Sequence, residues 1–300
     1  MSGAPFLALL GRRVEATGAV LCVGLDPDPT ELPVGFAGDV DGIASFARLV
    51  VETTAPLAAA FKANLAFFEA FGSPGLAALE GVRASIPSGI PFVADAKRGD
   101  IGPTAARQAA ALIDVLAADA VTLNPYLGLD SVAPFLERGV FAYVLCRTSN
   151  PSAGELQDLV VAPDRERLHA HVATMVESWD AGRGALGLVV GATVPDELAR
   201  VRRSAPHLPF LVPGVGAQGG SVEAALRHGP AAVGVAATFG GGGLLVNVSR
   251  GIARAALAPG GDPGTAIAEA AEGWRARLRV VHSGPESPEV MTPDVRPPTP

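Results

Sequence analysis

Short apolar runs separated by longer helix-patterned segments constrain the fold of this chain more than any other feature. Most of the runs are continuous rather than alternating, which is typical of parallel strands covered on both faces. The repetition of strand, loop and helix predicts a parallel sheet, and eight such units in 300 residues favour a single-domain (β/α)8, or TIM, barrel over an open doubly wound sheet. The runs expected to form strands are Ala19–Leu25, Ala58–Leu65, Pro91–Ala96, Ala120–Leu123, Phe141–Cys146, Leu186–Gly191, Pro209–Val212 and Ala231–Ala236.

Amphipathic segments between the runs predict helices, and prolines mark where two helices begin. Pro103 and Pro195 each stand where a first helical turn is expected, the position at which the missing N–H of proline costs nothing. From about residue 283 the chain is rich in proline and poor in large apolar residues, which predicts a disordered tail over 283–300 after a barrel domain over 1–282. The predicted helices include Ile43–Leu57, Thr104–Leu116, Asp164–Trp179 and Ser221–Arg227.

Charge and hydropathy exclude several classes of protein. A net charge of −7 argues against a general nucleic-acid binder, which needs a basic face. No apolar run reaches about 18 residues, so no membrane span is predicted. The basic pair near the N-terminus follows a short apolar stretch, the reverse of the order in a secretory signal, so we expect a cytoplasmic protein. Cys22 and Cys146 both lie in apolar runs; they could form one bridge, but a reducing compartment favours buried free thiols.

Two lysines stand out in this arginine-rich chain. Lys62 and Lys97 are its only lysines, against 21 arginines, and both lie at the downstream ends of apolar runs. An ammonium is compact and can give up a proton near neutral pH, whereas a guanidinium keeps its protons. In a barrel of this type the carboxyl ends of the strands form the active face. The sequence therefore indicates a functional site around the two lysines, although structural ion pairs would place charges in the same way.

Carboxylates accompany these lysines. Asp26 follows the first run, and Asp95 precedes Lys97 by two residues, a spacing that puts both side chains on one face of a strand. Asp100 lies beyond the strand, where the loop enters the next helix. Asp100 alone fits a helix-start carboxylate as well as it fits a site. The combination of Asp95, Lys97 and Asp100 favours the site.

Two further loops carry ligand-binding chemistry. The Gly-rich segment Pro213–Gly220 follows the seventh run, and Arg250 comes after the eighth run, beyond Phe239 and four glycines. Loops after strands seven and eight of such barrels often bind phosphate, and Arg250 could hold it with two hydrogen bonds, although glycine runs also form plain turns. The segment Arg147–Gly154 after the fifth run either reads the polar edge of a ligand or forms a turn. The four asparagines also fall at or shortly after runs: Asn64, Asn124, Asn150 and Asn247.

Other signatures are absent from the sequence. No His/Cys cluster has metal-ligand spacing, and there is neither a nucleophile elbow nor a P-loop. Gly214, Gly216 and Gly219 have the spacing of a dinucleotide-binding fingerprint, but the acidic residue that should end the following strand is absent. The five histidines lie in helix or late-loop contexts, so we assign them to the surface or to structure.

Taken together, Asp95-x-Lys97-x-x-Asp100, Lys62 on the preceding strand, the Pro213–Gly220 loop and Arg250 resemble the orotidine 5′-phosphate decarboxylase family. The form Asp-Ala-Lys-Arg-Gly-Asp-Ile, with Asn-Pro-Tyr after strand four and Ser-Arg-Gly after strand eight, resembles its longer bacterial branch, type 2. The resemblance covers about residues 15 to 280. The Asp-x-Lys-x-x-Asp core alone is shared with sugar-phosphate decarboxylases and aldolases.

The resemblance implies conversion of orotidine 5′-phosphate to UMP without any cofactor or metal, in a homodimer with a shared active site and with no nucleic-acid or membrane partner. It implies an alternating charged array, with Asp100 reaching across from the partner subunit. The implied site residues are Lys62, Asp95, Lys97 and Asp100 for catalysis, Ile101 and Thr104 beside Asp100, Asp26 and Lys62 for the ribose hydroxyls, Ser149 for the pyrimidine edge, and Gln218 and Arg250 for the phosphate. The resemblance does not specify which phosphate contacts come from the loops around Arg147 and Gly240–Gly243.

Two other functions stay open at this point. A magnesium-dependent sugar-phosphate decarboxylase or hexulose-phosphate aldolase would carry a metal-binding carboxylate near the position of Lys62. A non-catalytic nucleotide-binding barrel would act as a sensor, but a complete array of opposed charges is costly to bury without a purpose.

Overall fold

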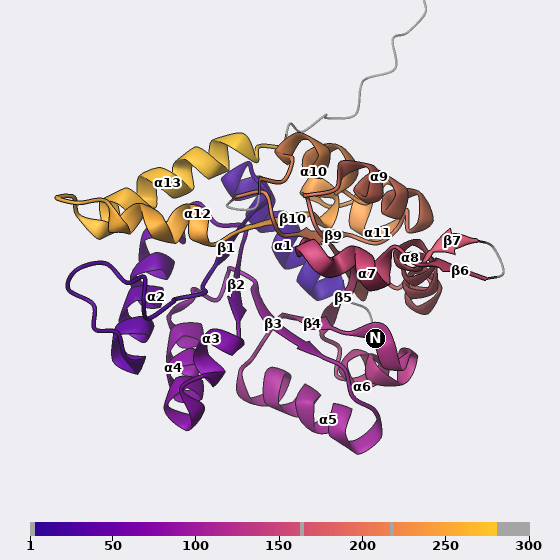
Figure 1. Cartoon of the computed structure of the whole chain (residues 1–300), viewed down its shortest axis with the longest axis horizontal. Helices are drawn as coiled ribbons and strands as arrows, with labels where there is room; N and C mark the ends of the chain where they lie inside the picture. Colours follow the sequence, from indigo (N-terminus) through magenta and orange to yellow (C-terminus); the bar gives the residue numbers. More distant parts are fainter. Residues whose placement is uncertain (1–3, 163–164, 217–218, 281–300) are drawn as a thin grey trace, which may run out of the picture.

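The described residues, 4–162, 165–216 and 219–280, form a closed barrel of eight parallel strands in this computed structural model (Figure 1). This confirms the (β/α)8 prediction. In order around the barrel, the strands are β1 (Leu21–Gly24), β10 (Leu245–Val248), β9 (Phe210–Val212), β8 (Leu186–Val190), β5 (Phe141–Arg147), β4 (Ala120–Leu123), β3 (Phe92–Arg98) and β2 (Ala60–Asn64).

Helices surround the barrel, and the strands, buried on both faces, carry the continuous apolar runs expected of such a sheet. A small antiparallel hairpin of β6 (Val160–Val161) and β7 (Glu166–Arg167) projects from the loop after β5. The helices are α1 (Ala4–Thr17), α2 (Val40–Thr54), α3 (Ala66–Glu69), α4 (Gly72–Ser85), α5 (Gly102–Ala110), α6 (Ala133–Glu137), α7 (Gly154–Gln157), α8 (Leu168–Asp180), α9 (Pro195–Ser204), α10 (Val222–His228), α11 (Gly234–Ala237), α12 (Arg250–Ala253) and α13 (Pro263–Arg277). Shorter turns are η1 (Ala111–Val115, a π turn), η2 (Pro125–Leu127), η3 (Leu129–Ser131), η4 (Pro151–Ala153), η5 (Gly240–Gly243) and η6 (Arg254–Leu257).

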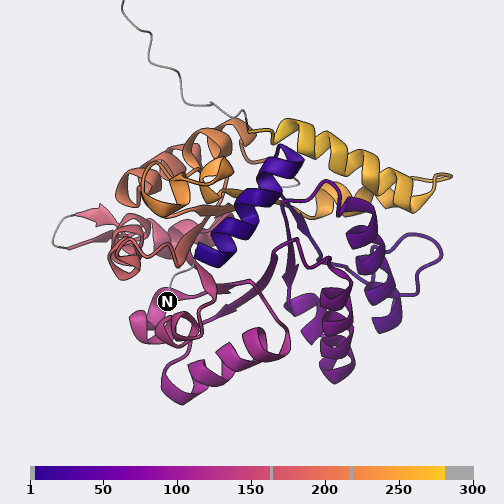
Figure 2. The ribbon, with the colours of Figure 1, turned by 180° about the vertical axis from the view of Figure 1, so that it is seen from behind.

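Helix α1 crosses the amino-terminal end of the barrel, as Figure 2 shows from behind. Its Phe6 stacks on Phe141, the first residue of β5, with ring centroids 4.7 Å apart. Phe6 also meets the ring of Tyr143 edge-on. This packing closes the amino-terminal end, so the opening of the barrel lies at the carboxyl ends of the strands.

The prediction of the eighth strand was wrong. Within the expected run Ala231–Ala236, Gly234 has a φ of 81° and begins α11, and Val233 and Val235 are 47% and 36% exposed. The strand that closes the barrel is β10, whose residues pair with β1 and β9. Asn247 interrupts the apolar pattern of β10 because its side chain faces a cavity, and this polar residue concealed the strand in the sequence.

Several local predictions are confirmed. Pro103 and Pro195 lie in the first turns of α5 and α9. Cys22 and Cys146 are buried free thiols, and burial raises the pKa of Cys22 to about 12. No helix in the described part of the chain is long and apolar enough to cross a membrane. The predicted tail over 283–300 lies outside the described residues.

Candidate active site

A cavity of about 730 Å³ opens at the carboxyl ends of the barrel strands. Loops after β1, β2, β5, β9 and β10 contribute its walls together with the end of β3 itself, which is where a barrel of this class carries its chemistry. Six of the residues predicted from the sequence line this one cavity: Asp26, Lys62, Asp95, Lys97, Ser149 and Arg250.

The two lysines converge on one carboxylate. Lys62 Nζ lies 2.8 Å from Asp95 Oδ2, and Lys97 Nζ lies 2.6 Å from Asp95 Oδ1. On its other side Lys62 approaches Asp26, with Nζ 3.9 Å from Oδ1. The side chains therefore form a row of alternating charge, Asp26–Lys62–Asp95–Lys97, built from the ends of three adjacent strands.

The backbone of β3 is irregular where it carries this row. Its register against β4 shifts between Ala94 and Arg98, and Lys97 has a φ of 47°, in the left-handed region that side chains other than glycine seldom adopt. Thr122 of β4 stabilises this conformation, because its hydroxyl accepts a hydrogen bond from Lys97 N at 2.9 Å and donates to Asp95 Oδ1 at 2.8 Å. Sequence reasoning missed Thr122; the available signal was a hydroxyl inside an otherwise apolar strand.

Mutual attraction fixes the charge of the buried part of the row. Burial alone would raise the pKa of Asp95, but the ammonium groups of Lys62 and Lys97 outweigh it and hold that pKa well below its usual range. Burial alone would lower the pKa of Lys62, which is 4% exposed, but Asp26 and Asp95 outweigh it and raise that pKa. Asp95 and Lys62 are therefore both ionised at neutral pH.

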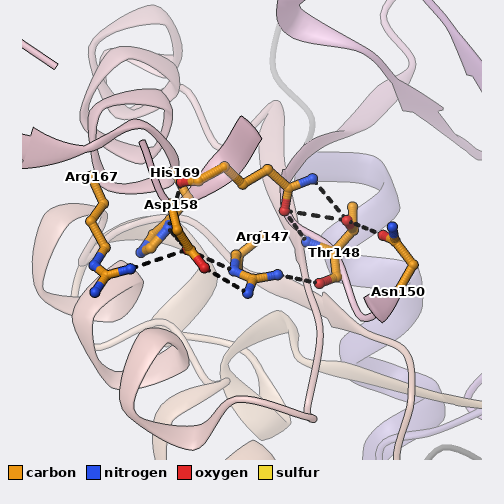
Figure 3. Close-up of polar contacts among 7 residues, drawn as sticks. Arg147, Thr148, Asn150, Asp158, Arg167 and His169 are labelled. Carbon is orange, nitrogen blue, oxygen red and sulfur yellow. Dashed lines mark hydrogen bonds and ion pairs between the residues drawn. The ribbon is translucent and has the colours of Figure 1, made fainter. Parts of the chain in front are cut away.

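A second group of polar residues follows β5. Thr148, Ser149, Asn150 and Gln157 line the cavity, which favours the ligand-binding interpretation of this segment over a plain turn. Gly191 makes room for it, since a Cβ there would lie 2.8 Å from the Cβ of Ser149. Arg147 does not line the cavity: its guanidinium pairs with Asp158 behind the loop (Figure 3).

The opposite wall carries groups suited to an anion. Arg250, Gly214 and Gly216 line the cavity at the ends of β10 and β9. Among the described residues, Asn247 Oδ1 and Ser249 Oγ are buried and have no hydrogen-bond partner, and both residues line the same wall. This wall therefore offers an anion the Arg250 guanidinium, the glycine backbone and the Ser249 hydroxyl, whereas Asn247 Oδ1 only accepts and suits a donor group of a ligand.

Three predicted site residues do not line this cavity. Asp100, Ile101 and Thr104 are not among the residues that line it, and the Asp100 carboxylate instead accepts a hydrogen bond from Ile101 N at 2.8 Å. Gln218 lies outside the described residues.

One pair of charged side chains that lines the cavity was not predicted from the sequence. Glu31, in the loop after β1, accepts two hydrogen bonds from the guanidinium of Arg254, at 2.9 and 2.6 Å, and both residues line the cavity. Arg254 lies one helical turn after Arg250, and that spacing was the signal available in the sequence.

The fold and the site define a class: a (β/α)8-barrel enzyme with a buried row of alternating charges beside an anion-binding wall. Comparison with known proteins agrees, because residues 19–261 match the profile of the Orotidine 5′-phosphate decarboxylase / HUMPS family. The chain belongs to this family. It is a carboxy-lyase that converts orotidine 5′-phosphate to UMP in pyrimidine biosynthesis.

Individual relatives support the assignment. The orotidine 5′-phosphate decarboxylase of Thermomicrobium roseum is 43% identical over 277 residues, which is 91% of this chain and 93% of that protein. The structure of Leishmania donovani OMP decarboxylase is similar with a TM-score of 0.76 and 41% identity, over 94% of this chain and all of that one. Leishmania donovani UMP synthase is similar with a TM-score of 0.75 and 43% identity, over 90% of this chain, which spans only 56% of that longer protein.

Proposed function

We propose that this chain decarboxylates orotidine 5′-phosphate without a cofactor, with Lys97 as the proton donor and Asp100 supplied by a second copy of the chain. The observation that carries the proposal is the position of Asp95, which accepts hydrogen bonds from both Lys62 and Lys97 within one cavity. Buried opposed charges are costly to assemble, and a reaction that needs fixed charge is a reason to keep them.

The reaction needs such a charge because of the intermediate. Heterolysis of the bond between C6 and the carboxyl carbon releases CO2 and leaves an electron pair on C6 in the plane of the pyrimidine, where the ring π system cannot delocalise it. An ammonium about 4 Å from this carbanion contributes about 4 kcal/mol at an effective dielectric constant near 20. Lys97 then donates a proton to C6 to give UMP, and solvent restores the proton on the lysine.

Asp95 is assigned a positioning role in this scheme. Its two oxygens are each held by a different lysine, so the ammonium of Lys97 is kept in one place before substrate arrives. Fixed groups of this kind need little reorganisation during reaction, which is the main source of electrostatic catalysis. The same carboxylate would lie near the departing CO2.

The remaining groups are assigned to substrate binding. Asp26 and Lys62 suit the ribose hydroxyls, Ser149 the edge of the pyrimidine, and Arg250 the phosphate. Their support is that all line the cavity, with Arg250 on the wall that also carries the unpartnered hydroxyl of Ser249. Gln218 keeps its phosphate role as a prediction from the sequence alone.

A second copy of the chain would complete the site. Asp100, Ile101 and Thr104 lie away from the cavity of their own chain, and Ile101 is 51% exposed at the start of α5. Turn η3, which contacts α5, and the preceding η2 add further exposed apolar side chains: Tyr126, Leu127 and Leu129. An exposed apolar surface of this kind marks a protein interface. We therefore include a homodimer with a shared active site in the proposal.

The reaction itself is tested by ultraviolet absorbance. Purified protein mixed with orotidine 5′-phosphate in the presence of EDTA should cause the absorbance loss that accompanies conversion to UMP. Full activity with EDTA supports a metal-free site. Activity that EDTA abolishes and magnesium restores would instead favour a magnesium-dependent enzyme and contradict the metal-free site.

The shared site is tested by subunit complementation. Each of the variants Lys97→Ala and Asp100→Ala should be nearly inactive alone. Mixed under conditions that exchange subunits, they should recover activity, because half of the hybrid sites then combine an intact Lys97 with an intact Asp100. Exchange without recovery would count against the shared site.

A further inference from the structure

The loop after β5 contains a directional series of hydrogen bonds that begins at a backbone group (Figure 3). Thr148 N donates to Gln157 Oε1 at 2.9 Å. A backbone N–H can only donate, so this bond fixes which end of the Gln157 amide is the oxygen. The Gln157 Nε2 must then be the end that donates to Thr148 Oγ1, at 2.8 Å.

The series continues to Asn150. Thr148 has a single hydroxyl proton, and its Oγ1 lies 2.6 Å from Asn150 Oδ1 but 3.2 Å from Gln157 Oε1. The shorter contact takes the proton, so Asn150 Oδ1 is the acceptor that ends the series. Among the described residues no hydrogen bond uses Asn150 Nδ2. Asn150 therefore brings two free N–H donors to a cavity that it lines.

The series is anchored behind the loop. Arg147 is 7% exposed and holds Asp158 with two hydrogen bonds, at 3.2 and 3.1 Å. The buried ring of His169 contacts the backbone oxygen of Gln157 through Nδ1, at 3.0 Å. Asp158 is adjacent to Gln157, so these contacts hold the glutamine from both sides. The backbone of Gln157 is therefore held in place, and its side-chain amide is held by its two hydrogen bonds to Thr148.

The order of strands places this loop where a base would lie. Strand β4 is directly opposite β10 in the ring of eight, and β3 and β5 flank β4. A nucleotide with its phosphate at Arg250, beyond β10, therefore extends its base toward the ends of β3 and β5. Lys97 lies on the first of these strands and Asn150 follows the second.

We propose that Asn150 donates a hydrogen bond to the C4 carbonyl oxygen of the pyrimidine, and that Thr148 and Gln157 are positioning residues that set the direction of this donor. The inference rests on the proposed function, which puts a pyrimidine nucleotide in this cavity. An oxo-pyrimidine such as uracil presents acceptor oxygens at C2 and C4, whereas cytosine presents an amino donor at C4. Both bases keep the C2 oxygen, so a fixed amide donor that faces C4 selects uracil-type bases over cytosine.

Titration of UMP and CMP into the purified protein tests the assignment of Asn150. Asn150→Asp replaces the donor with an acceptor of the same shape, and the ratio of CMP to UMP dissociation constants should fall at least tenfold. The added charge repels both phosphates equally and so cancels from the ratio. Ser152→Asp is the matched control: it adds the same charge to the same loop at a residue that does not line the cavity, and should leave the ratio unchanged.

Gln157→Glu tests the positioning role. The carboxylate still accepts from Thr148 N but cannot donate to the hydroxyl, and it competes with Asn150 for the hydroxyl proton. The ratio should fall at least threefold in this variant. With Asn150→Ala already present, Gln157→Glu should change the ratio no further, whereas a purely structural loosening of the loop would weaken UMP and CMP alike in either background.

The outcomes separate this inference from the proposed function. A parent chain that turns over orotidine 5′-phosphate while Asn150→Asp keeps its CMP-to-UMP ratio within twofold overturns the role of Asn150 alone. A parent chain that neither turns over orotidine 5′-phosphate nor binds UMP overturns the proposed function and this inference with it.

Discussion

Lys97 Nζ lies 2.6 Å from Asp95 Oδ1, and Lys97 has a positive φ, which residues of a regular strand do not have. On a regular strand, side chains two residues apart share a face at a separation of about 7 Å, and every residue has a negative φ. A positive φ at a residue other than glycine costs on the order of 1–3 kcal/mol. Here the bonds of Thr122 to both residues compensate for that cost. The location of the ammonium is therefore set by backbone geometry as well as by charge.

Lys97→Ala should abolish decarboxylation while the nucleotide still binds. Loss of the charge and of the proton donor predicts a fall in kcat of more than about 10³-fold, since general acid–base groups alone contribute roughly 10²–10⁴-fold. The dissociation constant of UMP should stay within about tenfold. Lys97→Arg should also be inactive, because a guanidinium keeps its protons at neutral pH. Steady-state kinetics and UMP titration measure both effects; activity of Lys97→Ala within tenfold of the parent would remove Lys97 from its role.

The depressed pKa of Asp95 predicts a loss of stability in acid. Because the folded-state pKa lies below the unfolded value of about 3.9, the ionised carboxylate stabilises the fold above that value. This contribution is lost as the pH falls from about 5 toward the folded pKa, with a slope of up to about 1.4 kcal/mol per pH unit from this one group. Urea denaturation at pH 7, 5, 4 and 3 measures the slope.

Asp95→Asn with Lys62→Met is the comparison for the acid experiment, since it removes the two buried charges together and leaves no buried ammonium unpaired; Lys97, whose side chain is 45% exposed, stays hydrated. Its free energy of unfolding should fall less steeply between pH 5 and pH 3 than that of the parent. Asp95→Asn alone should cost about 3–5 kcal/mol at pH 7, because it leaves Lys62 buried with only the more distant Asp26. Equal slopes in parent and double variant would contradict the coupling of Asp95 to its lysines.

The sequence was sufficient for the parts of the structure that repeat or that stand out chemically. Continuous apolar runs specified seven strands, because a buried parallel strand needs no alternation. The scarcity of lysine specified Lys62 and Lys97, and the two-residue spacing placed Asp95 with Lys97. These features depend only on composition and on residues close together in the sequence, so they can be predicted without knowing the fold.

Features that depend on distant partners were not predictable in this way. Strand β10 was not predicted because Asn247 interrupts its apolar residues. Only the closed barrel shows that Asn247 faces the cavity. Thr122 matters because β4 lies beside the irregular part of β3. Asp100 could not be separated from a helix-start carboxylate, and a single chain leaves it outside the cavity.

The excess of arginine also has a structural reason that composition alone does not give. Arg202 donates four hydrogen bonds to backbone carbonyl oxygens of separate segments and stacks on Phe210, with its guanidinium carbon 3.7 Å from the ring centroid. Arg13 likewise holds Ala55 O and Ala58 O. A planar group with five donors can do this and an ammonium cannot. Arginine therefore serves the scaffold, and both lysines line the active-site cavity.

Arg250→Ala should weaken binding of UMP at least about 100-fold, because a guanidinium–phosphate contact with charge-assisted hydrogen bonds is lost from a cavity wall. Binding of uridine, which has no phosphate, should change less than threefold. The difference between the two ligands separates loss of the phosphate contact from general damage to the site. Titration of both ligands provides the measurement, and an equal loss of affinity for UMP and uridine would contradict the phosphate role.

Ala181→Gly should stabilise the fold without affecting the site. Ala181 ends α8 with a φ of 47° and is exposed, so its Cβ meets the steric cost of the left-handed region without any packing in return. Glycine removes that cost, and the free energy of unfolding should rise by about 1 kcal/mol. Ala77→Gly, at an exposed position inside α4, should lower the free energy by a similar amount, because glycine there only adds entropy to the unfolded chain. Urea denaturation of the two variants tests the sign: a shift in the same direction for both would show that glycine acts on the unfolded chain and that the backbone at Ala181 is unstrained.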